Sequence, residues 1–192
     1  MTLIENSCCF TGYRPEKFGF SFCEDDKNYQ ALMTRIVTSI SIKIKEGVTD
    51  FYTGMAQGFD ILAAEHVALV KKLNKKIRLI AVIPFENQEA TFTNDWKTRY
   101  HELLKSCDEV IILNKDYTKW AYNQRNRYMV DRCRHIITYF DGKKGGTMNT
   151  VNYAVRHCRE VLNIYDTDPL AERKAQFKTQ FKIFPPNNDT KD

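Results

Sequence analysis

The sequence predicts a single α/β domain in which a mostly parallel sheet carries helices on both faces. Two observations predict this fold. Short apolar runs alternate along the chain with longer segments whose apolar residues recur at helical spacing. The apolar runs are also continuous, as is typical of strands that are buried on both faces. The chain has 192 residues, 43% of them hydrophobic, which suffices for one domain with a substantial core.

Six segments have the composition of strands. They lie at residues 7–11, 50–53, 78–83, 109–113, 135–140 and 161–164. Helical spacing predicts helices between them, at residues 29–46, 61–73, 91–106, 123–134 and from 151 onward. Gly47 fits the C-terminal cap of the first helix. The domain therefore spans residues 1–165, and residues 166–192 form a polar C-terminal extension.

Charge and composition narrow the classes of function. The net charge of +5 allows an anionic ligand without demanding nucleic acid. The six cysteines form no C-x-x-C pair and the four histidines are scattered, so we expect buried thiols and no metal site. We find neither the pattern of a signal peptide nor an apolar stretch long enough to cross a membrane. These features predict a cytoplasmic protein that makes no membrane contact.

A glycine-rich turn at residues 142–150 follows the fifth strand and precedes the last predicted helix. It contains Gly145, Gly146 and Thr147. Such a turn leaves backbone N–H groups exposed at the positive end of a helix, where a phosphate can bind. The alternative is a plain strand-to-helix turn, and an isolated Gly-Gly-Thr does not decide between the two.

Other conspicuous loops also begin where strands end. The loop after the first strand holds Thr11, Gly12 and Arg14, the second strand leads into residues 54–60, and Pro84 follows the third. The carboxyl ends of parallel strands share one edge of the sheet, and ligands lie there at the point where the strand order reverses. This convergence favours phosphate binding at the glycine-rich turn.

Several residues on these loops admit two interpretations. Asp60 is either a ligand contact or a helix N-cap, and Glu65 is either an acid–base group or a solvated charge on its helix. Arg14 either grips a phosphate or carboxylate or lies on the surface. Aromatic and basic residues are interleaved further on, which suits either stacking on a base or an aromatic loop that closes over the core: Lys119, Trp120, Tyr122, Arg125, Arg127 and Tyr128.

Five motifs occur in order between about Cys8 and Ile164. They are Cys9-Phe10-Thr11-Gly12-Tyr13-Arg14-Pro15, Gly54-Met55-Ala56-Gln57-Gly58-Phe59-Asp60 with Ala63-Ala64-Glu65, Ile83-Pro84-Phe85 with Gln88, Arg125-Asn126-Arg127-Tyr128-Met129-Val130-Asp131, and Gly145-Gly146-Thr147. Together they resemble the YpsA-like family of the SLOG superfamily, which also contains the Smf/DprA DNA-processing proteins and the LOG phosphoribohydrolases.

The resemblance implies a Rossmann-like fold and a pocket for a nucleotide or a nucleotide-derived ligand such as ADP-ribose or NAD, with no required cofactor. It leaves a homo-oligomer open. The residues expected to bind the ligand come from the motifs and the turn: Thr11, Gly12, Arg14, Gly54, Met55, Ala56, Gly58, Asp60, Pro84, Gln88, Arg125, Asn126, Gly145, Gly146, Thr147 and Thr150.

One position departs from the LOG pattern. Where the LOG enzymes have a glutamate three residues after the threonine of the turn, this chain has Thr150. The favoured prediction is therefore a binding protein with a sensor or sequestering role. The first alternative is a nucleotide N-glycoside hydrolase that uses Asp60 or Glu65. The second, less favoured, is single-stranded nucleic acid binding through Arg14, Arg125 and their basic and aromatic neighbours.

Overall fold

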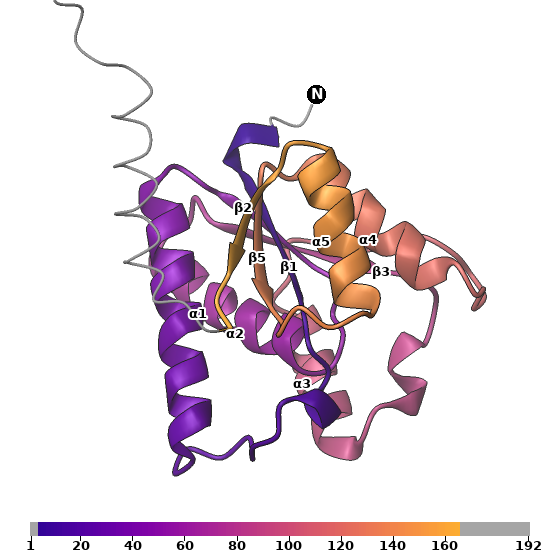
Figure 1. Ribbon diagram of the computed structural model, residues 1–192, viewed down its shortest axis with the longest axis horizontal. Coiled ribbons are helices and arrows are strands. Elements are labelled where there is room, and N and C mark those ends of the chain that lie inside the picture. Colours follow the sequence, from indigo (N-terminus) through magenta and orange to yellow (C-terminus); the bar gives the residue numbers. More distant parts are fainter. Residues whose placement is uncertain (1–3, 166–192) are drawn as a thin grey trace, which may run out of the picture.

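All six predicted strands pair side by side in one parallel sheet, which confirms the predicted fold class (Figure 1). The computed structural model describes residues 4–165, and the predicted extension at 166–192 lies outside them. The order across the sheet is β4-β3-β2-β1-β5-β6. The strands are β1 (Ser7–Gly12), β2 (Asp50–Thr53), β3 (Arg78–Ile83), β4 (Glu109–Ile112), β5 (His135–Tyr139) and β6 (Glu160–Asn163).

Five α-helices cover the two faces of the sheet, which gives the Rossmann-like three-layer arrangement. They are α1 (Lys27–Lys45), α2 (Phe59–Leu73), α3 (Asn94–Leu104), α4 (Ala121–Arg132) and α5 (Gly146–Arg156), with 3-10 turns η1 (Ile4–Asn6), η2 (Pro15–Lys17) and η3 (Gln88–Thr91). Helices α1, α2 and α3 share one apolar cluster with the sheet, and α4 and α5 share another on the opposite face. None of the helices in residues 4–165 is long and apolar enough to span a bilayer.

Local structure explains where two helices begin. Helix α1 starts two residues before the predicted position because the side chain of Asp26 accepts hydrogen bonds from the backbone N–H groups of Asn28 and Tyr29. Helix α3 starts at Asn94, three residues later than predicted, because the 3-10 turn η3 occupies Gln88–Thr91. Helical spacing alone did not distinguish that turn from the helix after it.

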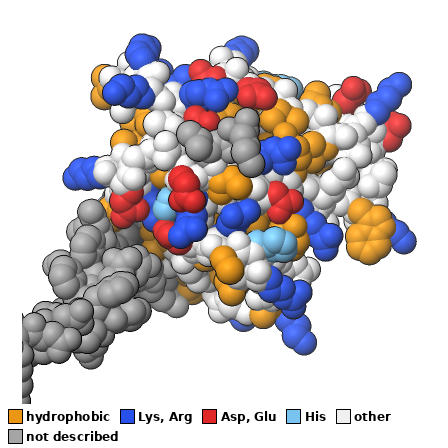
Figure 2. All heavy atoms as spheres, turned by 90° about the horizontal axis from the view of Figure 1, so that it is seen from above, with side chains coloured by type: hydrophobic (Ala, Val, Ile, Leu, Met, Phe, Trp, Pro, Cys, Tyr) orange, Lys and Arg blue, Asp and Glu red, His pale blue; other side chains and the backbone are white. Residues whose placement is uncertain are grey.

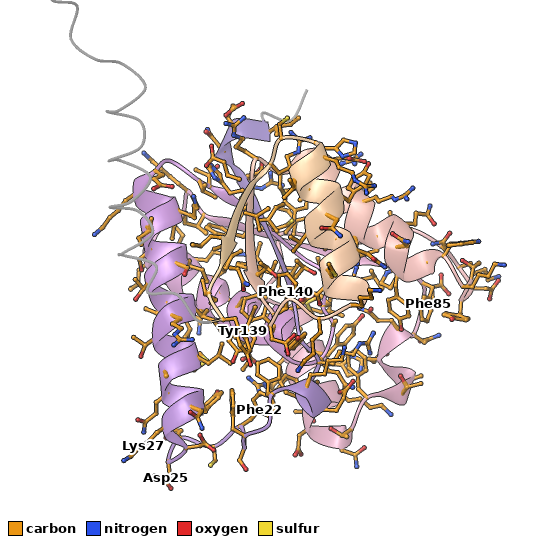
Figure 3. The ribbon with its side chains drawn as sticks, viewed as in Figure 1. Phe22, Asp25, Lys27, Phe85, Tyr139 and Phe140 are labelled. Atoms are coloured by element: carbon orange, nitrogen blue, oxygen red, sulfur yellow. The ribbon has the colours of Figure 1, made fainter. Side chains whose placement is uncertain are left out.

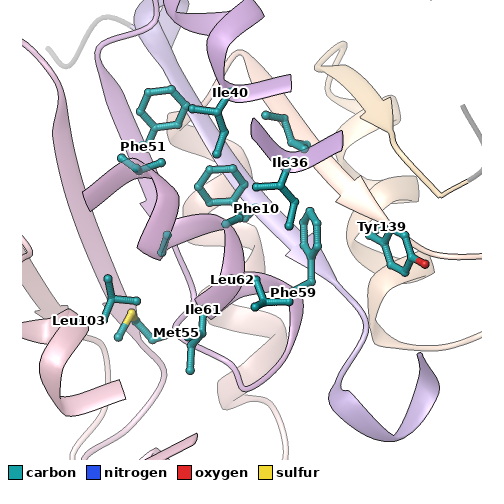
Figure 4. Close-up of a cluster of buried hydrophobic side chains, with 14 of the residues drawn as sticks. Phe10, Ile36, Ile40, Phe51, Met55, Phe59, Ile61, Leu62, Leu103 and Tyr139 are labelled. Carbon is teal, nitrogen blue, oxygen red and sulfur yellow. The ribbon is translucent and has the colours of Figure 1, made fainter. Parts of the chain in front are cut away.

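Stacked aromatic rings fix the position of α2 on the sheet (Figure 4). The ring of Phe10 on β1 stacks on Phe51 of β2 at 5.9 Å between centroids, and Phe59 at the start of α2 stacks on Tyr139 of β5 at 5.9 Å. A Cβ on Gly12 would lie 2.5 Å from the Phe59 ring, so the glycine permits this close contact. Figure 3 labels Tyr139, the last residue of β5, and Phe140 after it, at the carboxyl end of that strand.

The order of the strands reverses between β1 and β5. The chain adds β2, β3 and β4 on one side of β1 and then adds β5 and β6 on the other. The loops after β1 and β5 therefore diverge from neighbouring strand ends, which is where ligands bind in such sheets. Figure 2 shows the opposite end of the molecule, where acidic and basic side chains are interleaved. Glu160, the first residue of β6, accepts a hydrogen bond from Nη2 of Arg134 at 2.9 Å.

Candidate functional site

A cavity of about 150 Å³ opens at the carboxyl edge of the sheet, at the point where the strand order reverses. The loop after β1, the start of α2, the first turns of α4 and the start of α5 form its walls. Its lining residues are Thr11, Gly12, Tyr13, Arg14, Lys17, Ala56, Asp60, Tyr122, Arg125, Asn126, Gly146 and Thr147. Nine of these twelve were expected from the sequence to bind a ligand.

Helix α5 begins at Gly146, so the predicted helix start at residue 151 is wrong. Glycine has a low helix propensity, and the first turn therefore gave no helical signal in the sequence. Gly145 caps the helix without a side chain, and the first helical hydrogen bond runs from Asn149 N–H to Gly145 C=O at 3.0 Å. The N–H groups before Asn149 have no acceptor within the helix. Gly146 and Thr147 carry two of them beside the cavity.

Three cationic side chains surround the cavity. Arg14 and Arg125 both lie over the ring of Tyr122, at 5.3 and 6.0 Å from its centroid, and Lys17 lies 5.3 Å from the centroid of Tyr13. Cation–π contacts hold these groups without neutralising their charge. Together with the start of α5, they give the cavity a positive potential suited to an anionic group.

Asp60 is the one carboxylate that lines this cavity. Its Oδ2 lies 3.8 Å from Nη1 of Arg125, and both side chains are buried. Burial raises the pKa of Asp60 from 3.8 to about 6, against the opposing effects of Arg125 and Arg14. Burial likewise lowers the pKa of Arg125, against the effect of Asp60. Desolvation dominates at both groups because 3.8 Å is too long for a direct hydrogen bond.

The N-cap interpretation of Asp60 is wrong, because α2 begins at Phe59 and its N-cap is Gly58. Asp60 is the second residue of the helix. Gly58 has a φ of +96°, and a Cβ there would lie 2.5 Å from the carbonyl oxygen of Tyr13. Only glycine suits this backbone and this close approach. The chain reversal at Gly58 turns the carboxylate of Asp60 toward the loop after β1.

A second layer of expected residues lies behind the cavity wall. Arg125 donates from Nη1 to the carbonyl oxygen of Gly54 and from Nε to Oδ1 of Asn126, the latter at 2.8 Å. The amide of Gln88 donates to the same Gly54 carbonyl at 3.3 Å. Pro84 accepts a hydrogen bond from Asn114 at 2.7 Å. Gly54, Met55, Gly58, Pro84, Gln88 and Gly145 are outside the cavity lining, and the first three lie in the loop that positions Asp60.

Thr150 is also part of this supporting layer. Its side chain is buried in the first turns of α5 and donates to the carbonyl oxygen of Gly146 at 2.9 Å. It also accepts a hydrogen bond from Nδ2 of Asn126 at 2.8 Å. Thr150 therefore couples α5 to α4 and orients the amide of Asn126 at the cavity wall.

Two sets of expected residues lie away from the cavity. Glu65 accepts a hydrogen bond from Nε of Arg99 at 2.7 Å, which joins α2 to α3. The exposed Trp120 and its neighbour Lys119 lie outside the cavity, with the lysine 5.3 Å from the indole centroid. The structure thus divides the aromatic and basic stretch, because only Tyr122, Arg125 and Asn126 of this stretch reach the cavity.

Tyr13 and Lys17 also line the cavity and were not expected there, and Tyr122 was expected only as a candidate for base stacking. Lys17 ends the 3-10 turn η2, which begins at Pro15 and turns the chain back toward α5. Tyr122 lies on α4 one turn before Asn126. Because residues four apart lie on the same side of a helix, the expected position of Asn126 at the site could have identified Tyr122 as a lining residue. Within residues 4–165, His, Cys, Asp and Glu side chains form no cluster of three that could hold a metal ion.

The parallel sheet, its strand order and the cavity at the reversal define a Rossmann-like α/β protein. The chain belongs to the YspA SLOG family (YpsA), whose model matches residues 8–171. The uncharacterized SPbeta prophage-derived protein YoqJ of Bacillus subtilis is 32% identical over 122 residues, which cover 57% of this chain and 71% of YoqJ.

Two solved structures of DNA processing protein A (DprA) share the fold. The protein from Helicobacter pylori has a TM-score of 0.56 and 17% identity, over 94% of this chain and 82% of that chain. The protein from Streptococcus pneumoniae has a TM-score of 0.54 and 17% identity. This match covers 91% of the present chain and spans only 56% of the S. pneumoniae chain.

Proposed function

We propose that this protein binds a phosphorylated nucleotide or a nucleotide-derived ligand such as ADP-ribose or NAD, and that it acts as a sensor or sequestering protein. The observation that carries the proposal is the combination of three cationic side chains with the uncapped start of α5 around one cavity. Free N–H groups at a helix start and a neighbouring guanidinium are the groups that bind phosphate oxygens.

The size of the cavity suggests which part of the ligand enters it. Sites for drug-sized ligands occupy roughly 300–1,000 Å³. A cavity of about 150 Å³ suits a phosphate or a ribose phosphate. The remainder of a nucleotide would then lie across the open rim, where the ring of Tyr122 offers a stacking surface.

Isothermal titration calorimetry with ADP-ribose, NAD and AMP tests this proposal. We expect saturable binding of at least one of them, and we expect Gly146→Glu to abolish it because the new carboxylate enters the phosphate position. Nothing lies within 4 Å of a Cβ at Gly146, so the backbone at this position has room for a side chain to begin. Val155→Glu places the same carboxylate on an exposed part of α5 and should leave binding intact. Absence of binding by all three ligands would contradict the proposal.

Hydrolysis of an N-glycosidic bond is a second candidate function, which the buried carboxyl of Asp60 favours. A carboxyl with a pKa of about 6 can exchange a proton near neutral pH, and its anion can stabilise a developing oxocarbenium ion. Water would supply the hydroxyl to the sugar. From AMP the leaving adenine takes up the second proton of the water, whereas from NAD the nicotinamide leaves as a neutral base and that proton passes to the solvent. Chromatography after incubation with AMP or NAD should then detect free base with the wild type and none with Asp60→Asn. Absence of release from every nucleotide would exclude this activity.

Single-stranded nucleic acid binding is the third candidate, favoured by the exposed Trp120 beside Lys119. The H. pylori neighbour is described by its single-stranded DNA binding mode. An aromatic surface with nearby cations is typical of such binding, whose affinity falls steeply with salt. Titration of a labelled oligonucleotide at two salt concentrations tests it. Trp120→Ala should weaken binding, and an affinity that does not change with salt would exclude this function.

A further inference from the structure

A hollow of about 210 Å³ lies between α4 and α5, separate from the cavity. The two helices pack side by side on the same face of the sheet (Figure 1). Two arginines, three asparagines and one tyrosine line the hollow: Asn123, Arg127, Asn149, Asn152, Tyr153 and Arg156. This lining contains no carboxylate, so it combines two positive charges with several amide donors.

Neither arginine of the hollow is neutralised by an anionic partner. Among the arginines of residues 4–165, Arg156 alone has no hydrogen bond, ion pair or aromatic contact. The guanidinium of Arg127 lies 5.2 Å from the ring centroid of Tyr153, whose hydroxyl donates to Asp131 at 2.9 Å. A cation–π contact restrains a guanidinium and leaves its N–H donors available to a ligand.

The hollow and the cavity are neighbours along both helices. On α4, Asn126 lines the cavity and the next residue, Arg127, lines the hollow. On α5, Thr147 lines the cavity and Asn149 lines the hollow. The hydrogen bond from Asn126 to Thr150 at 2.8 Å joins the two helices at this boundary. A ligand held in the cavity therefore has the hollow as an adjoining surface.

The distance between the two sites limits which ligand can fill both. From Thr147 to Tyr153, α5 advances six residues, or about 9 Å. Helical side chains lean toward the N-terminus of their helix, which brings the guanidinium of Arg156 closer to the cavity. The two phosphates of a diphosphate share one oxygen and are too close together to occupy both sites. Phosphates on different hydroxyls of one ribose are held apart by the sugar.

The charge of the hollow favours a phosphate over a carboxylate. A phosphomonoester carries about 1.5 to 2 negative charges near neutral pH, which matches two guanidinium groups, whereas a carboxylate carries one. Arginine also binds phosphate oxygens through two parallel hydrogen bonds. The three asparagine amides can donate to the remaining oxygens or to sugar hydroxyls.

We propose that the hollow between α4 and α5 binds a second phosphate of the nucleotide whose first phosphate lies at the start of α5. The ligand is then a nucleotide with a phosphate or diphosphate at the 5′ position and a further phosphate on the 2′ or 3′ hydroxyl of the same ribose. Arg127 and Arg156 determine the specificity for that further phosphate. This inference rests on the proposed function and narrows its class of ligand.

Calorimetry with two matched pairs of nucleotides tests the inference. Adenosine 3′,5′-bisphosphate differs from AMP by one phosphate, and NADP differs from NAD in the same way. In at least one pair, the wild type should bind the member with the extra phosphate at least about tenfold more tightly. Arg127→Gln and Arg156→Gln should each reduce this preference to about threefold or less. AMP should bind both variants as it binds the wild type, because neither side chain lines the cavity.

Arg132→Gln is the matched control. It removes an arginine from the same helix, but Arg132 lies outside the lining of the hollow, 3.5 Å from the ring centroid of Tyr128. The control should keep the wild-type preference, and melting temperatures verify that all three variants fold. A preference that survives both Arg127→Gln and Arg156→Gln, or that falls equally in Arg132→Gln, would show that the hollow is not the site.

A new carboxylate in the hollow provides a second test. Asn152→Asp keeps the shape of the side chain and places a negative charge among the lining residues, so it should remove the preference by repulsion. Gln124→Glu adds the same charge elsewhere on α4, where the side chain accepts a hydrogen bond from Asn114 at 3.2 Å, and should keep the preference. An unchanged preference in Asn152→Asp contradicts the assignment.

The outcomes separate this inference from the proposed function. Equal affinities within both pairs, with AMP or NAD bound, overturn the inference and leave the proposed function standing. Inorganic phosphate that binds alongside AMP, without any preference within the pairs, would show that a separate anion occupies the hollow and would also overturn the inference. If none of the four nucleotides binds, both proposals fail.

Discussion

The guanidinium of Arg125 lies 3.8 Å from the carboxylate of Asp60, and the two side chains are each only 6% exposed. Both charges are buried at the wall of a cavity that also holds Arg14 and Lys17. The cavity therefore carries a net positive charge even with the ion pair formed. An incoming phosphate would add a second anionic partner to the same guanidinium.

Removal of Arg125 should destabilise the protein through the carboxylate that it leaves behind. We expect Arg125→Met to lower the free energy of unfolding by about 3 kcal/mol at pH 7.5, as when one partner of a buried ion pair is lost. Combination with Asp60→Asn should reduce the loss to about 1 kcal/mol. Urea unfolding measures both values. Arg99→Met, which breaks the more exposed pair with Glu65, should cost no more than about 1 kcal/mol.

The pH dependence of stability should reveal the buried carboxyl of Asp60. Its pKa is about 6 in the folded protein and near 3.8 in the unfolded chain, so the folded state holds this proton more tightly. The stabilisation that protonated Asp60 contributes to the folded state falls as the pH rises from about 4 to above 6. Between about pH 4.5 and pH 7, the wild type should lose about 2 kcal/mol relative to Asp60→Asn. If the free energies of unfolding of the wild type and Asp60→Asn changed with pH by the same amount, the pKa of Asp60 would not be raised.

Substitution of Gly54 should displace Arg125. A Cβ at Gly54 would overlap Nη1 of Arg125, whose side chain is held by the Gly54 carbonyl and by Asn126. We expect Gly54→Ala to weaken ligand binding at least tenfold and to cost about 1–3 kcal/mol of stability through overpacking. Gly146→Ala meets no neighbour within 4 Å and should keep wild-type stability. Calorimetry and urea unfolding of the two variants give the comparison. If Gly54→Ala and Gly146→Ala changed binding and stability equally, Arg125 would not be the side chain through which Gly54 affects the ligand.

Loss of the Thr150 hydroxyl should release the side chain of Asn126. Thr150→Val keeps the shape of the side chain and removes its hydrogen bonds to Asn126 and to the carbonyl oxygen of Gly146. We expect a loss of about 1 kcal/mol of stability and a several-fold loss of ligand affinity. Thr150→Ser retains the hydroxyl and should bind as the wild type does. A Thr150→Val protein with full affinity would show that the orientation of Asn126 is unimportant.

The sequence by itself determined where the strands lie along the chain and their parallel arrangement, because continuous apolar runs between amphipathic helices leave few other ways to bury both faces. It also placed the loops around Gly12, Asp60 and Gly146 at one edge, since strand direction fixes that edge. These predictions depend on local periodicity, which can be read along the chain.

Only the tertiary structure decided which of these residues share a cavity. The contact of Arg125 with Asp60 and the pairing of Glu65 with Arg99 join separate elements, and their geometry depends on how helices pack on the sheet. The start of α5 at Gly146 was hidden because glycine gives no helical signal. The exposure of Ile112 was hidden as well, because an apolar strand looks the same in sequence whether or not a helix covers it.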